Sequence, residues 1–535
     1  MRDLLQTEIT TQASLRPDAP AIVTGDGQIT YAELEESSNR LARLLRAAGC
    51  ARGERVCLLM PKGISVVVAI LGVLKADAIW VPIDVSGPAV RIRKILASCQ
   101  SRWILADDGG LRVLDELFED PAFASRHSVG WLSSERVDGH AFHPAFTLSD
   151  LAGYSSAPMH CASEPDHPTH IVFTASSNGA PRGVAVTHRN VLAFVRWARR
   201  HFSTAPEDRV SWHPPVHLDL SAFDIFGTLG AGATLYPVPP DLSLLPHRLA
   251  DFIREAELTQ WFSVPSMLNY MAKFDAVRYG DFPSVRRVLW CGDVLPTATL
   301  MHWMQRMPHA TFTNLYGPTE ATIASSYFTV PACPDNERTE IPIGRACPGE
   351  ELLVLDRALR PLPAGETGDL YIRGVGLSPG YWGDEEKTRN AFLPNPLGGP
   401  PGDRIYRTGD LARIGSDGFV YYVGRADTQI KSRGYRVEVG EVEAALQSLG
   451  ILRECAVLGV PSSGFEGTAI CCTYVTDGVE GVTPARLREG LTDLLPNYMV
   501  PSRWLQLDVL PRNATGGIDR LALRAMIGKY ETSPA

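Results

Sequence analysis

The sequence lacks a long hydrophobic run, and this argues against a membrane-spanning protein. Its longest apolar stretch covers only residues 64–74, whereas a transmembrane helix needs about 20 apolar residues. Asp3 and Glu8 lie where a secretion signal would place its apolar core. We therefore expect a cytoplasmic protein with no membrane partner.

The sequence also has no excess of basic charge. Its 51 Lys and Arg residues are outnumbered by 60 Asp and Glu residues, the net charge is -9, and no long block of one sign occurs. Nucleic acids and anionic membrane surfaces both bind basic protein faces. We therefore expect no nucleic-acid partner.

Cysteines in metal-binding or disulfide patterns are absent as well. The 10 cysteines are scattered, none forms a CxxC pair, and Cys471 and Cys472 are adjacent. This distribution suits neither a disulfide framework nor a zinc site, and reduced thiols are the simplest interpretation.

The length and texture of the chain predict a layered α/β protein. A chain of 535 residues exceeds what one hydrophobic core normally supports. From about residue 30 to residue 327, β-rich runs alternate with helical patterns. Residues 64–74 read as a helix, and strands are expected at 56–60, 80–83, 170–173 and 287–290, each followed by a turn and a helix. This alternation predicts largely parallel sheets covered by helices, with ligands at the carboxyl ends of the strands.

The texture changes after about residue 341. Short strands at 351–355, 368–372 and 419–423 lie between Gly, Pro and Asp turns and predict a small antiparallel β-barrel. Beyond residue 425 the pattern predicts a compact α+β unit. Its helices are expected at 440–449 and 484–494, and its strands near Val457, near Thr473 and at 504–507. We predict an N-terminal core of residues 1–426 and a small, mobile α+β C-terminal lid domain of residues 427–535.

One short segment is more informative than any bulk property. Residues 314–320 read Asn-Leu-Tyr-Gly-Pro-Thr-Glu. They combine an aromatic ring, a Gly-Pro break, a hydroxyl and a carboxylate, which could stack a purine, bond a phosphate and hold a divalent cation. For Gly-Pro alone, an ordinary turn before a helix is the alternative.

Three further segments carry groups that could bind a nucleotide. Residues 173–183 follow a strand and are rich in Ser, Thr and Gly, so their amides and hydroxyls could cradle phosphate, although the GxxxxGK[ST] spacing is missing. Residues 406–410 end in Asp410, which could bind both ribose hydroxyls. Residues 424–434 lie on the expected domain boundary and could form a hinge that carries active-site residues. Taken singly, a surface loop, a β-turn and a solvated loop are the alternatives.

The order of these segments resembles the adenylate-forming superfamily, specifically the amino-acid adenylation domains of nonribosomal peptide synthesis. The resemblance begins at residues 30–34 and 74–78 and extends to residues 511–520, so it covers nearly the whole chain. It implies that a substrate carboxylate attacks the α-phosphate of ATP and releases pyrophosphate. The phosphopantetheine thiol of a separate carrier protein then displaces AMP to give a thioester. No carrier-protein serine motif is present, so we expect a stand-alone loading enzyme.

The resemblance implies a site for ATP and Mg²⁺. Tyr316 would stack on adenine, Thr319 would bond the α-phosphate, and Glu320 would be the metal ligand. Asp410 would bind the ribose hydroxyls, and Asp427 would be the hinge on which the C-terminal domain rotates between two half-reactions. The remaining implied nucleotide-binding residues are Thr174, Ser177, Gly179, Arg182, Asn314, Gly317 and Arg425.

Asp219 matches the family carboxylate that pairs with the ammonium group of the substrate. A buried ammonium ion requires such a partner. The alternative is a helix N-cap, a role that Ser221 could take instead. The other implied pocket walls are Leu220, Phe223, Ser263, Leu289, Cys291, Leu315, Ile323 and Ala324. None of these could pair with a charged side chain, and Leu220 and Phe223 are bulky. We therefore expect a small or medium aliphatic amino acid, either α or β.

The sequence departs from the family at two cations. Gly517 stands where the family ordinarily has a lysine that bridges the substrate carboxylate and the α-phosphate. Losing one such contact typically costs a factor of about 10² to 10³ in rate. Arg182 replaces a lysine of the phosphate loop, and Lys431 or Arg512 could supply the missing cation.

Three hypotheses remain open at this point. The first is a working amino acid–AMP ligase. The second is a weakened relative that binds nucleotide or carrier without efficient adenylation. The third is a ligase of the same superfamily that activates an acid without an amine.

Overall fold

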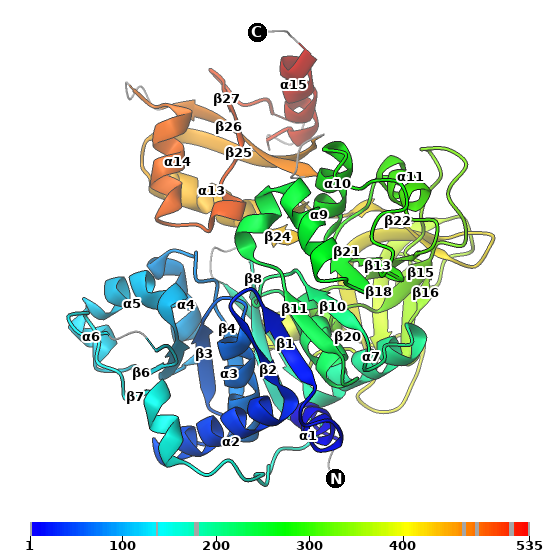
Figure 1. The fold of residues 1–535 in the computed structure, drawn as a ribbon. Coiled ribbons are helices and arrows are strands. Elements are labelled where there is room, and N and C mark those ends of the chain that lie inside the picture. The colour runs from blue at the N-terminus through cyan, green and yellow to red at the C-terminus, as the bar shows by residue number, and fades with distance from the viewer. Residues whose placement is uncertain are drawn as a thin grey trace.

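The computed structural model describes residues 3–134, 137–175, 181–462, 467–476, 481–512 and 518–532. It has the expected α/β fold, with two large sheets, a small antiparallel sheet and a C-terminal α+β unit that lies at the opposite end of the molecule from the N-terminus (Figure 1).

The first large sheet sets the position of the conspicuous segment at residues 314–320. It has nine strands in the order β16-β15-β14-β13-β12-β10-β11-β1-β2. The central strands β10 to β14 run parallel, so their carboxyl ends reach one edge together. The strands are β1 (Pro20–Thr24), β2 (Gly27–Thr30), β10 (Arg209–Trp212), β11 (Thr234–Pro237), β12 (Gln260–Ser263), β13 (Arg287–Trp290), β14 (Thr311–Tyr316), β15 (Ser326–Thr329) and β16 (Arg345–Ala346).

The second sheet has eight strands in the order β19-β9-β8-β4-β3-β5-β6-β7. The strand predicted at 170–173 is β8, but it returns as antiparallel β9, so the prediction of a following helix is wrong. The reason is the β-branched run after the loop, in which Val184 and Val186 are buried and favour a strand. The strands are β3 (Arg55–Leu59), β4 (Ile79–Pro82), β5 (Trp103–Ala106), β6 (Ser128–Trp131), β7 (Phe146–Thr147), β8 (Pro168–Thr174), β9 (Arg182–Thr187) and β19 (Gly380–Tyr381).

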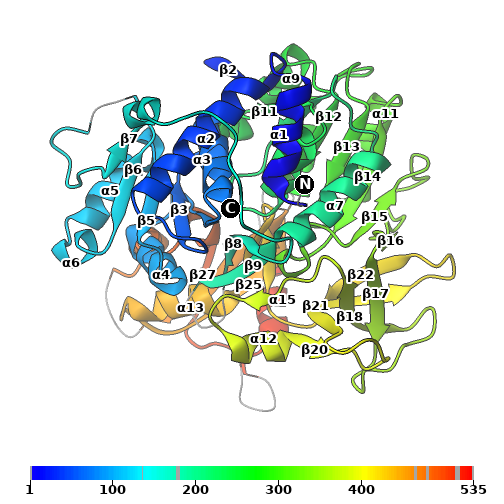
Figure 2. The same cartoon turned by 90° about the horizontal axis from the view of Figure 1, so that it is seen from below.

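Helices α2 (Tyr31–Ala47) and α3 (Ile64–Lys75) share one hydrophobic core with both sheets (Figure 2). Thr30 and Glu33 start α2 with a reciprocal capping box, which explains the Thr and Glu of the segment at 30–34. The other helices of this part are α1 (Leu5–Leu15), α4 (Ala89–Cys99), α5 (Leu111–Phe118), α6 (Pro121–Ala124), α7 (His188–His201), α9 (Pro246–Glu255), α10 (Pro265–Lys273), α11 (Thr297–Arg306) and α12 (Glu385–Ala391). Helices α4 and α5 contribute to a second core against the eight-stranded sheet.

An antiparallel half-barrel and the C-terminal unit complete the chain. The half-barrel consists of β17 (Glu350–Leu355), β18 (Thr367–Gly374), β20 (Phe392–Pro394), β21 (Arg404–Ile414) and β22 (Val420–Arg425). After it come the hairpin of β23 (Ile430–Ser432) and β24 (Tyr435–Val437), and a three-stranded sheet of β25 (Leu452–Pro461), β26 (Thr468–Thr476) and β27 (Arg503–Gln506). Helices α13 (Val439–Ser448), α14 (Pro484–Thr492) and α15 (Arg520–Thr532) belong to the same unit, in which α13 and α14 share a separate core with the sheet.

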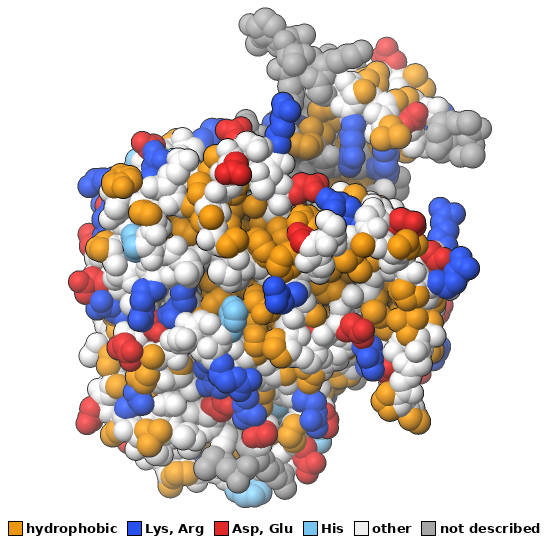
Figure 3. Space-filling view, turned by 90° about the vertical axis from the view of Figure 1, so that its right-hand side faces the viewer, with side chains coloured by type: hydrophobic (Ala, Val, Ile, Leu, Met, Phe, Trp, Pro, Cys, Tyr) orange, Lys and Arg blue, Asp and Glu red, His pale blue; other side chains and the backbone are white. Residues whose placement is uncertain are grey.

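The surface carries both signs of charge. Figure 3 shows acidic and basic side chains interspersed on one face of the molecule. Within the described ranges, every helix is too short or too polar to cross a membrane.

A buried ion pair joins α2 to α3. The Nζ atom of Lys75 lies 2.7 Å from Glu35 Oε2 and donates hydrogen bonds to Ser38 and Asn39. Replacing Lys75 with Met should cost about 3–5 kcal/mol of unfolding free energy, because Glu35 is then buried without its cation. Urea unfolding measures this loss. The double variant Lys75→Met/Glu35→Gln should recover part of it, and an equal loss in both variants would contradict the ion-pair explanation.

Candidate functional site

The predicted segments meet at two adjoining cavities between the strand ends of the nine-stranded sheet and the β23–β24 hairpin. The larger cavity has a volume of about 340 Å³ and is lined by Asn314, Leu315, Tyr316 and Gly317 together with the residues that follow β13. The smaller has a volume of about 100 Å³. The sequence-predicted residues that line the smaller cavity are Thr174, Asp219, Leu220, Cys291, Gly317, Thr319, Asp410, Arg425 and Lys431.

The turn after β14 is folded back tightly on itself. A Cβ atom on Gly317 would lie 2.6 Å from the Cα of Ala324, so only glycine permits this approach. Thr322 and Ile323 have positive φ angles of 58° and 68°, which are rare for β-branched residues. The Thr322 hydroxyl donates a hydrogen bond of 2.7 Å to the carbonyl of Gly376 and holds the strained turn in place.

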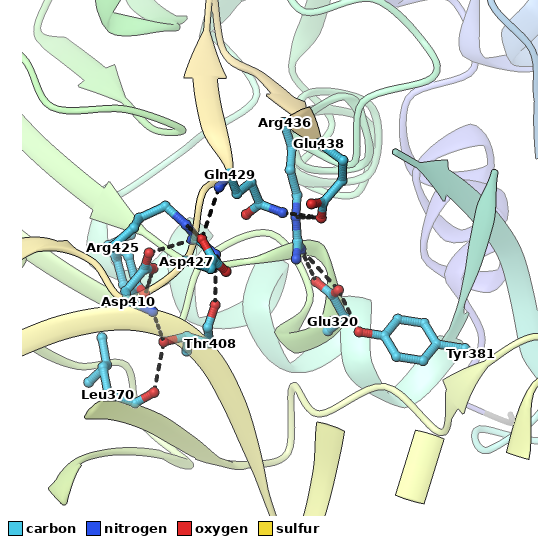
Figure 4. Close-up of polar contacts among 11 residues, drawn as sticks. Glu320, Leu370, Tyr381, Thr408, Asp410, Arg425, Asp427, Gln429, Arg436 and Glu438 are labelled. Carbon is cyan, nitrogen blue, oxygen red and sulfur yellow. Dashed lines mark hydrogen bonds and ion pairs between the residues drawn. The ribbon is translucent and has the colours of Figure 1, made fainter. Parts of the chain in front are cut away.

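A chain of polar contacts fixes the expected ribose carboxylate. The Tyr316 hydroxyl donates to Asp410 Oδ2 at 2.5 Å, and Arg425 contacts Asp410 Oδ1. Arg425 also donates two hydrogen bonds of 2.7 Å to Asp427, the expected hinge residue (Figure 4). Burial raises the pKa of Tyr316, so its hydroxyl stays protonated and remains a donor.

Glu320 is fully buried and is paired with an arginine from the C-terminal unit. Arg436 Nη1 lies 3.0 Å from both carboxylate oxygens, and the Tyr381 hydroxyl donates to Oε1 at 2.9 Å (Figure 4). Burial acts to raise the pKa of Glu320, but the guanidinium of Arg436 lowers it. Glu320 therefore carries its charge with a protein cation as its partner.

This pairing bears on the expected magnesium site. Both oxygens of Glu320 accept from Arg436, so in this arrangement the carboxylate does not fit a divalent cation. In the part of the chain that the structure describes, His, Cys, Asp and Glu residues form no group of three that could hold a metal. The sequence did not indicate Arg436 as a site residue, because the charged segment before it carries no signal that the hairpin lies against the buried Glu320.

The β23–β24 hairpin is docked against the strand ends at several points. Gly434, with a φ of +80°, packs on Val264 so closely that a Cβ atom would overlap that side chain. Tyr435 stacks on Tyr498 with ring centroids 3.9 Å apart. Nearby, Arg91 of α4 and Glu441 of α13 form a buried ion pair. These contacts bring Lys431 to the site, where its Nζ atom lies 5.7 Å from the centroid of the Tyr316 ring.

Asp219 precedes a short helix, α8 (Leu220–Ala222), which continues as a π-helical turn, Phe223–Gly227. Its side chain makes no cap hydrogen bond. The Ser221 hydroxyl donates to Pro215 and accepts from Trp212, so the N-cap alternative is wrong for both residues. Burial raises the pKa of Asp219 to about 6, against a hydrogen bond from Thr319 that lowers it.

The pocket beside Asp219 is small, with a volume of about 100 Å³. Leu220 and Cys291 line the smaller cavity, and Leu315 lines the larger one. The other predicted walls are buried but do not line either cavity: Phe223, Ser263, Leu289, Ile323 and Ala324. Burial raises the pKa of Cys291 to about 12, so this wall presents a neutral thiol.

The phosphate loop is only partly described. Thr174 ends β8 and pairs with Arg182 at the start of β9. The Arg182 guanidinium lies over the Tyr381 ring, 4.7 Å from its centroid. Ser177, Gly179 and Gly517 lie outside the described residues.

Comparisons with known proteins agree with this arrangement. The family described as "AMP-binding enzyme" matches residues 9–382, and "AMP-binding enzyme C-terminal domain" matches residues 441–516. The chain is 35% identical to phosphinothricin tripeptide synthetase PhsC of Streptomyces viridochromogenes over 96% of its length and 44% of that protein. It is 32% identical to the dimodular nonribosomal peptide synthase of Bacillus subtilis over 97% of its length and 21% of that protein. It thus spans less than half of either curated relative.

Among solved structures, the chain is similar to the Vibrio cholerae adenylation domain AlmE in complex with glycyl-adenosine-5'-phosphate. The TM-score is 0.84 at 26% identity, and the match covers 99% of this chain and 98% of that one.

The Glu320–Arg436 pair predicts competition with Mg²⁺. Replacing Arg436 with Gln should lower the Mg²⁺ concentration needed for half-maximal ATP binding about tenfold. The metal then no longer has to break the charged hydrogen bonds between Arg436 and Glu320. Calorimetric ATP titrations at graded Mg²⁺ concentrations measure this. Lys387→Gln, which removes a cation paired with Asp384 elsewhere, should leave the Mg²⁺ dependence unchanged. An unchanged dependence in Arg436→Gln would refute the competition.

Proposed function

Because the chain belongs to the AMP-binding enzyme family, we propose that it is an ATP-dependent amino acid–AMP ligase. One observation carries the amino-acid part of the proposal. Of the three carboxylates Asp219, Asp410 and Glu320, two have guanidinium partners, Asp410 with Arg425 and Glu320 with Arg436. Within the described ranges, Asp219 has a hydroxyl partner, Thr319, and no cation. A buried carboxylate without a cation favours an ammonium group from a ligand.

In the proposed reaction, adenine lies against Tyr316 in the larger cavity, and the ribose reaches Asp410 in the smaller one. The smaller cavity takes the amino acid, with its ammonium group at Asp219. This places the substrate carboxylate near Thr319 and the α-phosphate. The residues contribute positioning and charge balance, as is usual when a phosphorus centre is attacked.

We propose that the substrate is a small or medium aliphatic amino acid, α or β. The small cavity of about 100 Å³ supports this size, and the predicted side-chain walls Leu220 and Cys291 have no charge to pair with a charged side chain. The glycyl adenylate bound by AlmE supports a small substrate as well.

The proposed second half-reaction transfers the aminoacyl group to the phosphopantetheine thiol of a separate carrier protein. Kinship with peptide synthetases supports this acceptor. We propose that residues 427–535 rotate as a unit about Asp427 relative to residues 1–426. Mg²⁺ would enter with ATP, and Glu320 would become available to it only when Arg436 withdraws.

Amino-acid-dependent ATP–pyrophosphate exchange tests the proposal. The panel contains α- and β-amino acids and matched carboxylic acids without an amine. Exchange with a small amino acid is expected. Clean ATP binding with no exchange for any substrate would support a nucleotide-binding relative without efficient adenylation. Exchange with an amine-free acid would support an acyl-acid ligase.

Asp219→Ala should abolish amino-acid-dependent exchange while leaving the Kd for ATP unchanged, because the ammonium group loses its counter-ion. Exchange kinetics and ATP calorimetry measure the two effects. Asp241→Ala, which makes the same substitution at an exposed aspartate outside both cavities, is the control and should retain exchange. Full exchange in Asp219→Ala would show that Asp219 does not bind the ammonium group.

The pH dependence of amino-acid use follows from the raised pKa of Asp219, about 6. Only the ionised carboxylate pairs with an ammonium group. The kcat/KM for the amino acid should therefore be level above about pH 6 and fall about tenfold per pH unit below it. Steady-state exchange between pH 5 and 8 measures this limb. If Asp219→Asn retains activity with the same acid limb, another group is responsible.

A further inference from the structure

Among the described residues, the two cavities share three lining residues, Gly292, Gly317 and Lys431. Lys431 is the one of the three that carries a charge. If adenine lies in the larger cavity and the ribose and the amino acid reach Asp410 and Asp219 in the smaller, the nucleotide passes the junction of the two cavities and its α-phosphate lies close to it. A lysine from the C-terminal unit is therefore placed beside the reacting atoms.

The ammonium group of Lys431 is available for a ligand. Within the described ranges, its side chain makes no ion pair or hydrogen bond, and its closest aromatic contact is the Tyr316 ring at 5.7 Å. Its charge reaches the cavity walls, since it acts on Asp293 and Cys291 in the direction that lowers the pKa of each. Both of those residues follow β13 at the edge of the cavities.

The hairpin places Lys431 opposite a second cation, Arg436. Lys431 pairs directly with Arg436 across the β23–β24 register, and like charges in opposed positions destabilise a strand pair. Glu320 offsets this repulsion, because both of its oxygens accept from Arg436. The same ion pair therefore neutralises Glu320, and among the described residues Lys431 is left without a salt bridge, with Asp293 as the carboxylate on which its charge acts at the cavity edge.

The proposed first half-reaction concentrates negative charge at that junction. A carboxylate oxygen of the amino acid forms a bond to the α-phosphorus. The bond between the α-phosphorus and the α,β-bridging oxygen breaks, and its electron pair leaves with pyrophosphate. No proton is transferred, so the step needs a cation and not a general base.

We propose that Lys431 is the catalytic cation of adenylation in this chain, contacting the α-phosphate and substituting for the family lysine that Gly517 replaces. The inference rests on the proposed function for its reaction. It differs from the family pattern, because the cation comes from the β23–β24 hairpin and not from the segment at 511–520.

A binding experiment tests the contact without requiring turnover. In the full-length protein, Lys431→Met should weaken AMP binding about tenfold or more and leave adenosine binding unchanged, because only AMP carries the α-phosphate. Lys387→Met, a matched lysine substitution outside both cavities, should change neither affinity. Equal weakening of AMP and adenosine, or no change in AMP binding, would overturn the contact.

A kinetic experiment tests the catalytic role. Lys431→Met should lower kcat for ATP–pyrophosphate exchange by a factor of about 10² to 10³, and Lys431→Arg should recover part of it. Gly517→Lys in the Lys431→Met background should restore exchange by returning a cation to the same phosphate. Undiminished exchange in Lys431→Met would overturn the inference. If wild-type protein shows no exchange with any acid, the proposed function fails, and the AMP and adenosine affinities still decide whether Lys431 binds the phosphate.

Discussion

The arrangement of the site depends on one buried ion pair, that of Glu320 with Arg436. Glu320 belongs to the turn after β14, and Arg436 belongs to the hairpin of the C-terminal unit. Removing one partner of a buried pair typically costs about 3–5 kcal/mol, because the other charge is left without compensation. The pair therefore ties the position of the hairpin to the charge state of the nucleotide-binding turn. It acts together with the packing of Gly434 on Val264 and of Tyr435 on Tyr498, which also hold the hairpin at the cavities.

The three carboxylates Asp219, Asp410 and Glu320 differ in their partners. Asp410 and Glu320 are held by arginines, and their geometry is set before any ligand arrives. Asp219 has no arginine partner among the described residues, and burial raises its pKa against Thr319 and the backbone amides of Leu220 and Ile323, so its charge is only partly stabilised. Preorganised groups bind the invariant part of a substrate without reorganisation, whereas a partly stabilised carboxylate gains most from a ligand cation. In the proposed function, this difference separates the nucleotide side of the site from the amino-acid side.

The sequence predicted most of the fold because periodicity and turn residues are local signals. The strand expected at 287–290 is β13, Arg287–Trp290, and the helix expected at 64–74 is α3, Ile64–Lys75. The sequence did not predict the β8–β9 hairpin, because no local signal shows that the strand after the loop pairs antiparallel with β8. The ordered motifs indicated residues that line the cavities, and the roles of these residues toward nucleotide and amino acid stay predictions. They did not indicate Arg436, since its partner Glu320 is distant in sequence and only the tertiary fold brings the two together.

The strained turn at Thr322 and Ile323 has a consequence for how substrate preference could evolve. Each of these two β-branched residues destabilises the fold by about 1–3 kcal/mol through its positive φ angle. They keep this conformation because the close approach at Gly317 and the hydrogen bond to Gly376 fix the turn. A turn built in this way cannot adapt by backbone movement. New substrates would have to be acquired one side chain at a time, and such exchanges would leave Thr319 in place. The chemistry of the site and its selectivity are therefore free to diverge separately.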